Sequence, residues 1–226
     1  IRERERHQRR RAVEYARELW ASGQPCRGHP YLTAKGLSLL GANGLRTWHG
    51  TVRSRDGDDI TDTWLLVPMG WGGKLVNVQR ISSKGVKRQI ANAPQVGACF
   101  TLDRPGAALT CIVEGLATGL AVFQAVRHAR VHVAFYADNL MPLTERLGMS
   151  GSVVFAADND HKTKALRGMN PGIEKAKNAA EYIGAGVAYP TGIEGSDWAD
   201  YLYETGEGAP KRIERQILAG AKFVMP

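Results

Sequence analysis

The chain has 226 residues and a formal net charge of +8, and 43% of its residues are hydrophobic. Such a length and composition fit one well-buried domain or two small ones, and exclude a disordered or collagen-like protein. The longest apolar runs, such as 131–137, are far shorter than the roughly 20 residues of a membrane helix. With three unpaired cysteines, a soluble cytoplasmic protein is expected, and the start at Ile1 without a signal segment predicts a fragment of a longer polypeptide.

The charge is divided unevenly along the chain. Residues 1–107 contain 18 Lys and Arg against 9 Asp and Glu, whereas residues 108–226 contain 12 against 13. A basic surface favours a polyanion such as nucleic acid, and a near-neutral part with acidic clusters favours a site that holds cations. We therefore predict a basic N-terminal subdomain over 1–107 and a second, chemically different subdomain over 108–226.

The N-terminal part predicts a helix followed by antiparallel strands. Apolar residues recur at spacings of three and four over 2–22, and Gly23 and Pro25 end that helix. Short β-type runs follow at 64–69, 74–81 and 86–90, separated by glycines and serines. This pattern is typical of an antiparallel meander in a small α+β unit.

The second part alternates short apolar runs with helical stretches. The apolar runs are 110–113, 131–135, 152–157 and 186–189, and the helical stretches between them are 116–129, 143–147 and 172–183. Strands that alternate with helices at this spacing form βαβ crossovers. The sequence thus predicts an α/β fold, a parallel sheet with flanking helices, after the smaller basic α+β subdomain.

Acidic residues follow three of the predicted strands. Glu114 follows the first strand, Asp158 and Asp160 follow a later one, and Asp197 lies shortly after the last. Sites of parallel sheets form beyond the carboxyl ends of the strands, and carboxylates gathered there repel each other unless a cation such as Mg²⁺ or Mn²⁺ lies among them. Two structural alternatives stay open: Glu114 as a complement to a helix dipole and Asp197 as a helix N-cap.

The sequence around these acids carries a family resemblance. The segments 114–121, 157–160 followed by 170–172 and 176–180, and 197–200 resemble the Toprim domain, and within it the Toprim primase domains of phages and mobile plasmids. The resemblance implies that Glu114, Asp158 and Asp160 are the catalytic acids and metal ligands. It also implies, on looser flanking sequence, that Asp197 is a further metal-site acid.

Basic residues crowd the predicted meander. Five cations lie within fifteen residues without an acid, a composition typical of phosphate binding, although lysines that protect an exposed strand edge are the structural alternative. Asn77 is expected to add hydrogen bonds to bases or sugars, and a loop at 161–167 to hold a triphosphate or to be a mobile surface loop. The predicted nucleic-acid and nucleotide contacts are Lys74, Asn77, Arg80, Lys84, Lys87, Arg88, Lys162 and Lys164.

The resemblance implies a DNA primase core that joins ribonucleoside triphosphates on a single-stranded DNA template, with Mg²⁺ or Mn²⁺ as cofactor. Implied partners are a replicative helicase or further domains of the parent protein, in a bacterial host cytoplasm or nucleoid. A Toprim nuclease and a non-catalytic DNA-binding or helicase-docking module are the alternatives. Cys26 and His29 form only half of a zinc-binding pattern, so no zinc ribbon is expected within this chain.

Overall fold

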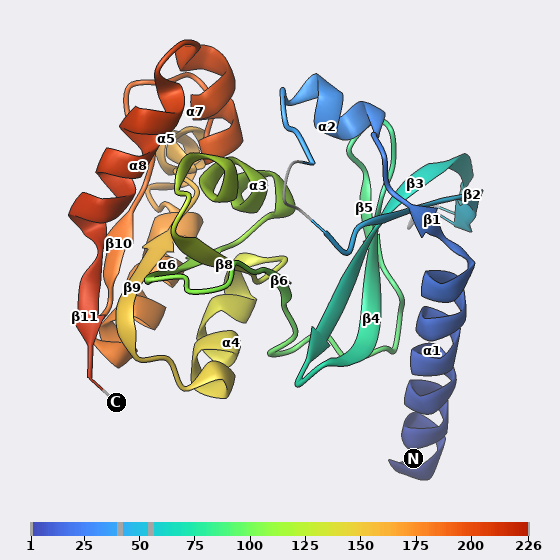
Figure 1. Cartoon of the computed structure of the whole chain (residues 1–226). Coiled ribbons are helices and arrows are strands. Elements are labelled where there is room, and N and C mark those ends of the chain that lie inside the picture. The colour runs from blue at the N-terminus through green and yellow to red at the C-terminus, as the bar shows by residue number, and fades with distance from the viewer. Residues whose placement is uncertain (1, 40–42, 54–56, 226) are drawn as a thin grey trace.

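The computed structural model describes residues 2–39, 43–53 and 57–225. Two β-sheets lie side by side, each with its own helices, and α1 extends along the outer side of the first sheet (Figure 1). The elements of the N-terminal part are α1 Arg2–Ser22, β1 Gln24–Pro25, α2 Pro30–Ala34, β2 Arg46–Arg53, β3 Asp59–Trp71, β4 Lys74–Ile81 and β5 Lys87–Gln89.

The second part contains more elements than its apolar runs predicted. It is made of β6 Phe100–Leu102, β7 Leu109–Val113, α3 Leu116–Ala125, β8 Ala129–Val133, the 3₁₀ helix η1 Ala137–Asn139, α4 Leu140–Leu147, β9 Gly151–Ala156, α5 His161–Arg167, α6 Pro171–Ile183, β10 Gly186–Ala188, α7 Trp198–Thr205, α8 Ala209–Gly220 and β11 Lys222–Val224. None of the helices in the described residues is long and apolar enough to cross a membrane.

The first sheet is antiparallel throughout, with the strand order β1-β2-β3-β4-β5. The predicted helix over 2–22 and the predicted meander are confirmed, and β1 and β2 extend the meander at one edge. The turn between β3 and β4 is made by Gly72 and Gly73, which both have positive φ. Two successive residues of positive φ give a turn whose twist matches that of the flanking strands, and glycine adopts this conformation without strain.

Both faces of the first sheet are covered. Trp64, Leu66 and Val78 pack with Ala16 and Leu19 of α1. The alternate residues of β3, which point to the other face, belong to the core that the first sheet shares with β6, β7 and α3. The sheet therefore joins α1 on one side to the second part of the chain on the other.

The second sheet has the order β10-β9-β7-β8-β6. Strands β7 to β10 pair in parallel, which confirms the predicted parallel sheet, whereas β6 pairs antiparallel with β8 at one edge. At the other edge, β10 pairs with residues 154–156 of β9 and β11 pairs antiparallel with residues 151–153. Strand β6 precedes residue 107 yet pairs in this sheet, and the division of the chain at that point remains a prediction.

Helices cover both faces of the second sheet. Val113 of β7 faces the core that contains α3, α7 and α8, and Ile112 faces the core that contains α4 and α6. A strand buried on both faces is apolar at every position, which explains why β7 reads as a continuous apolar run. This double cover leaves the carboxyl ends of the strands as the open edge of the sheet.

Candidate active site

Glu114 and Asp158 lie at the same edge of the second sheet. Strands β7 and β9 are parallel neighbours in which Val113 pairs with Ala156, so the two acids leave adjacent strands at the same end. The carboxylate of Glu114 accepts a hydrogen bond from the backbone N–H of Ala137, which follows β8. The hydroxyl of Thr118 on α3 donates to Asp158 over 2.7 Å. Three strand exits and one helix therefore hold this acid pair.

Both acids are harder to ionise than ordinary carboxyl groups. Burial raises the pKa of Glu114, and the nearby charge of Asp160 raises it further, while the Lys87 ammonium group opposes the shift. Burial also raises the pKa of Asp158 well above its usual range, with a further contribution from the charge of Glu114. Their charged forms lack the solvation that water or a cation would supply.

Asp160 is fixed by the segment that leads into α6. Its carboxylate accepts the N–H of Gly172 over 3.1 Å, and its own N–H donates to the side chain of Asn170 over 3.1 Å. Asn170 also caps α6 by accepting the N–H of Ile173. A Cβ at Gly172 would lie 2.5 Å from the carbonyl oxygen of Asp158, so only glycine allows this approach.

Asp197 caps the first turn of α7. Its carboxylate accepts the N–H of Asp200 over 2.7 Å, and the two residues form a capping box. Its other carboxylate oxygen accepts from Lys35, the C-cap residue of α2, over 3.1 Å, and Lys35 also reaches Asp200 over 2.9 Å. The structural alternative of an N-cap is therefore observed, while the charge of Asp197 still contributes to the raised pKa of Asp158.

The acids match a hard divalent cation in charge and donor type. In the described part of the chain, no three His, Cys, Asp or Glu side chains are grouped closely enough to hold a metal ion. The mutual influence of Glu114, Asp158 and Asp160 on ionisation nevertheless places them within electrostatic reach of one another. Carboxylate oxygens that repel each other are donors suited to Mg²⁺ or Mn²⁺. Toprim domains of primases generally depend on divalent metal ions.

Lysines of the first sheet face the acid edge. The Lys87 ammonium group on β5 would lie 3.8 Å from a Cβ at Gly115, directly after Glu114. A pocket of about 470 Å³ beside it is lined by Lys35, Lys84, Lys87 and Asp197, with Tyr31 among its other residues. Burial raises the pKa of the Tyr31 hydroxyl to about 12, so it stays a hydrogen-bond donor at neutral pH. The acid edge and these lysines form the two sides of one candidate site.

Two arginines of the basic set lie at the β5 edge of the first sheet. A pocket of about 360 Å³ is lined by Arg53, Arg80, Lys87 and Arg88, and none of its described lining residues is acidic. Arg80 is buried and donates to the carbonyl of Gln89 over 3.1 Å, and burial lowers its pKa. Arg88 is half-buried and lies opposite Arg80 in the strand pair. Arg80 therefore has a structural contact that the exposed lysines lack.

Asn77 does not fulfil the expectation of a base or sugar contact. Its side chain is fully buried, its amide donates to the carbonyls of Ile90, Ala93 and Pro94, and its oxygen accepts the N–H of Ile90. All of its polar groups are thus used inside the chain, and it orders the segment after β5. We leave Asn77 out of the proposed interface for this physical reason.

The remaining predicted basic residues lie apart. Lys162 and Lys164 are exposed on α5. The expectation of a loop at 161–167 was wrong, because this segment is a helix that starts after Asp160. Lys74 lies next to the β3–β4 turn and lines a separate pocket. The structure therefore brings Lys84 and Lys87 to the acids and places Lys74 elsewhere.

Sequence reasoning missed several members of this site. Lys35 gave no signal because its partners, Asp197 and Asp200, are more than 160 residues away in the chain. Thr118 was part of the quoted motif, but only the packing of α3 shows that its hydroxyl reaches Asp158. Asn170 was detectable, because Asn followed by Pro is a helix-start signal.

Comparisons with known proteins agree with this geometry. Residues 109–208 match the Toprim domain family. Two DNA primase TraC proteins of Escherichia coli are each 31% identical to the chain, over 174 and 169 residues, which is 71% of this chain in both cases. The chain spans only 15% and 11% of the lengths of these relatives.

Solved structures share the fold at lower identity. The primase fragment of the bacteriophage T7 primase-helicase protein superposes with a TM-score of 0.59 at 15% identity, covering 88% of this chain and 77% of that one. The RNA polymerase domain of Mycobacterium tuberculosis primase DnaG gives 0.53 at 15% identity, covering 98% and 84%. Residues 109–208 are therefore a Toprim domain, within a chain that is homologous to the DNA primase TraC and has the fold of primase catalytic domains.

Proposed function

We propose that the chain is the catalytic core of a DNA primase, which synthesises short RNA primers on single-stranded DNA by divalent-metal-dependent nucleotidyl transfer. The observation that carries the proposal is the pair of half-buried acids with raised pKa, Glu114 and Asp158, facing Lys87 of a basic sheet. Perturbed acids in a cleft opposite cations fit a reaction that handles metal-bound phosphates. The TraC homology supports primer synthesis over other Toprim reactions.

The proposed metal ligands are Glu114, Asp158 and Asp160, with Asp197 as a further acid. A bound Mg²⁺ or Mn²⁺ would lower the pKa of a ribonucleotide 3′-hydroxyl and neutralise charge on the phosphates. Thr118 holds one oxygen of Asp158, and Asn170 and Gly172 hold Asp160, so these carboxylates are positioned before substrate binds. Such preorganisation avoids rearrangement during the reaction.

The basic groups have a second role in this proposal. Lys84 and Lys87 line the pocket that also contains Lys35, and they are placed to bind the triphosphate of an incoming nucleotide or the template backbone. Lys87 also lowers the cost of ionising Glu114. Lys162 and Lys164 of α5 are proposed as further phosphate contacts, because their helix starts next to Asp160.

An extension assay tests the proposal. The chain is incubated with single-stranded DNA, labelled ribonucleoside triphosphates and Mg²⁺ or Mn²⁺, and the products are separated on a denaturing gel. Short labelled oligonucleotides that require the template support the primase. Shortened template without labelled product indicates a nuclease, and unchanged template with retained binding indicates a non-catalytic DNA-binding module.

A matched pair of variants ties the product to the acid site. Asp158→Asn removes one proposed ligand, whereas Asp103→Asn changes an exposed acid that pairs with Arg130 at the start of β8. Primer synthesis should be lost in the first variant and retained in the second. Equal loss in both would indicate a general effect on folding, and equal retention would remove Asp158 from the mechanism.

A further inference from the structure

A second pocket lies where the two sheets meet, and we call it the hairpin pocket. Its volume is about 420 Å³, which is in the range of small-molecule sites. Trp20 comes from α1, Trp71 and Lys74 from either side of the β3–β4 turn, Phe100 from β6 and Leu147 from α4. It shares no lining residue with the pockets that contain Lys84, Lys87 or Arg80.

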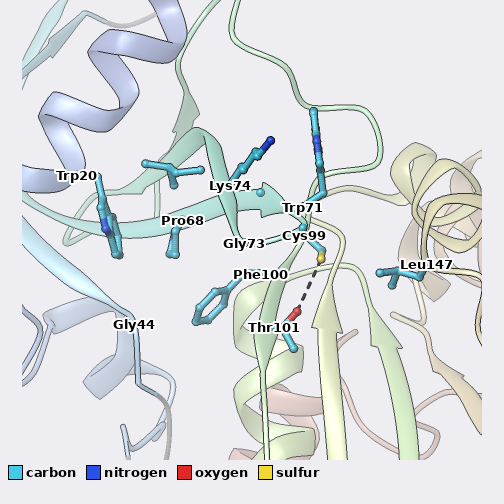
Figure 2. Close-up of a pocket in the computed structure, with 13 residues that line it drawn as sticks. Trp20, Gly44, Pro68, Trp71, Gly73, Lys74, Cys99, Phe100, Thr101 and Leu147 are labelled. Carbon is cyan, nitrogen blue, oxygen red and sulfur yellow. Dashed lines mark hydrogen bonds between the residues drawn. The ribbon is translucent and has the colours of Figure 1, made fainter.

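The walls of the hairpin pocket are aromatic. Figure 2 shows Trp20 and Phe100 on one side of the hollow and Trp71 on the other, with Lys74 between them. Gly70 and Cys99 exchange two backbone hydrogen bonds of 3.0 and 2.9 Å, which join β3 to the start of β6 beneath these rings. The rings therefore come from elements that are held together by backbone contacts.

Cationic side chains surround the hairpin pocket. Lys74 lines it, Arg46 lies 4.9 Å from the ring centre of Trp20, and Arg146 lies 4.3 Å from that of Trp71. Arg17 donates to the carbonyl of Leu75, another lining residue. None of these four cations belongs to an ion pair in the described ranges, and no lining residue is acidic.

The positive charge continues along α1. Arg17 also lines a shallow hollow with Arg6, Arg9 and Arg10, which are exposed on the same helix, so four cations stand there against one acid, Glu14. The helix rises by about 16 Å over the eleven steps from Arg6 to Arg17. A single bound nucleotide would use only the end of this row next to the pocket, whereas a strand would follow it.

We propose that the hairpin pocket binds a base of single-stranded DNA, with the phosphates of that strand on Lys74, Arg17 and the arginines of α1. Stacking on aromatic rings combined with backbone contacts to cations is how proteins hold single strands without reading their sequence. An apolar side chain of a protein partner would leave the surrounding cations unused. The inference rests on the proposed function, because it takes single-stranded DNA as the template.

The test compares two pocket variants with two matched controls. Trp71→Leu removes an aromatic ring and Lys74→Ala removes a cation at the pocket, whereas Trp48→Leu and Lys211→Ala make the same changes outside it, on β2 and α8. Thermal melting first establishes that all four variants are folded. Binding is then measured by anisotropy with a labelled single-stranded oligonucleotide and, separately, by competition with a free deoxymononucleotide.

The two pocket variants should each bind the oligonucleotide about fivefold or more weakly than the wild type, and the controls should bind it like the wild type. An oligonucleotide carrying photoreactive iodouracil should crosslink to Trp20, Trp71 or Phe100. Unchanged binding by both pocket variants, or crosslinks only near the acid edge, would overturn the inference. A free mononucleotide that competes as well as the oligonucleotide would overturn the assignment of a strand.

Primer synthesis by the wild type separates this inference from the function on which it rests. If the wild type makes primers and the pocket variants bind single-stranded DNA normally, the proposed function stands and the pocket inference is wrong. If the wild type makes no primers but crosslinks in the pocket, and the pocket variants bind more weakly, the pocket inference stands and the proposed function is wrong. A second readout is template length, since the pocket variants should lose more activity on long templates than on short ones.

Discussion

The acid edge of the second sheet and the basic surface of the first sheet both gather like charges, but in different ways. Glu114 and Asp158 are half-buried at strand exits, and their pKa values are raised by desolvation and repulsion. Lys84 and Lys87 are exposed, and neither forms a salt bridge with an acid in the described residues. The acids therefore destabilise the metal-free fold when ionised, whereas the lysines remain solvated and free to meet phosphates.

This difference assigns different roles to the two regions. A half-buried, preorganised acid pair suits chemistry at one fixed point, where a misplaced ligand is costly. An exposed row of cations suits a flexible polyanion, because each contact contributes separately and without a fixed sequence. Lys35 and Lys87 connect the regions by reaching across to the acids.

The largest expected effect comes from breaking the acid side alone. Glu114→Gln, Asp158→Asn or Asp160→Asn should each lower primer synthesis at least ~100-fold, because a metal ligand contributes several kcal/mol to the transition state. Single-stranded DNA affinity should stay the same or rise slightly, because each change removes a charge that repels the template. Gel assays and anisotropy measure the two quantities. Primer yield near that of the wild type in all three variants would contradict the metal-site assignment.

The acid side was predictable from the sequence because backbone geometry determines it. Parallel strands end at one sheet edge, so Glu114 and Asp158 had to meet once the strands were recognised. The basic side depends on packing between distant segments, which leaves no local signal: Lys35 reaches α7 only in the folded chain. Asn77 looked like a polar group on a basic strand, but β4 is covered on both faces and its amide is consumed internally.

A divalent metal ion should raise the stability of the fold through the acids at the edge of the second sheet and not through the basic surface of the first. At 10 mM Mg²⁺ and an affinity of about 1 mM, linkage gives about 1.4 kcal/mol, or a few degrees in Tm. Because their folded pKa values are raised, Glu114 and Asp158 destabilise the metal-free fold as pH rises above the ordinary carboxyl range near 4. The Mg²⁺ response should therefore be present at neutral pH and fade toward pH 4, as differential scanning fluorimetry would show.

The double variant Asp158→Asn with Asp160→Asn is the control for this response. It should be more stable than the wild type in EDTA at neutral pH, because the repulsion is gone, and it should no longer respond to Mg²⁺. A double variant that is less stable in EDTA and still responds like the wild type would show that these two acids are structural. The metal site would then lie elsewhere.

The basic surface of the first sheet is tested by comparing a variant of an exposed cation with a variant of a buried one. Lys87→Ala should weaken binding to every single-stranded sequence alike and reduce the salt slope by about 0.7, which is about fivefold in affinity at 0.1 M salt. Arg80→Ala should instead lower stability, because the buried guanidinium bonds the Gln89 carbonyl. Lys211→Ala, on α8, is the exposed control. Equal slopes for Lys87→Ala and the control would favour edge protection over phosphate binding.

The smallest effect is expected where the two regions meet, at Lys35. Lys35→Ala should cost about 1 kcal/mol at neutral pH, because the carboxylates of Asp197 and Asp200 keep their backbone donors and the lost ion pairs are partly exposed. Hydrogen bonds from Ser196 and Lys35 outweigh burial and lower the pKa of Asp200 in the fold. That contribution is present above the unfolded pKa and is lost as pH falls through the folded one, so the difference should shrink in acid.

The same variant separates the two readings of Asp197. If Asp197 joins the metal site, Lys35 competes for its carboxylate, and Lys35→Ala should strengthen the Mg²⁺ response in thermal melts. If Asp197 only caps α7, the variant should lower the Tm equally with and without Mg²⁺. Urea unfolding of Lys35→Ala, Asp197→Asn and the double variant measures the coupling between the two residues. A coupling near zero at neutral pH would mean that Lys35 does not tie the basic sheet to the acid edge.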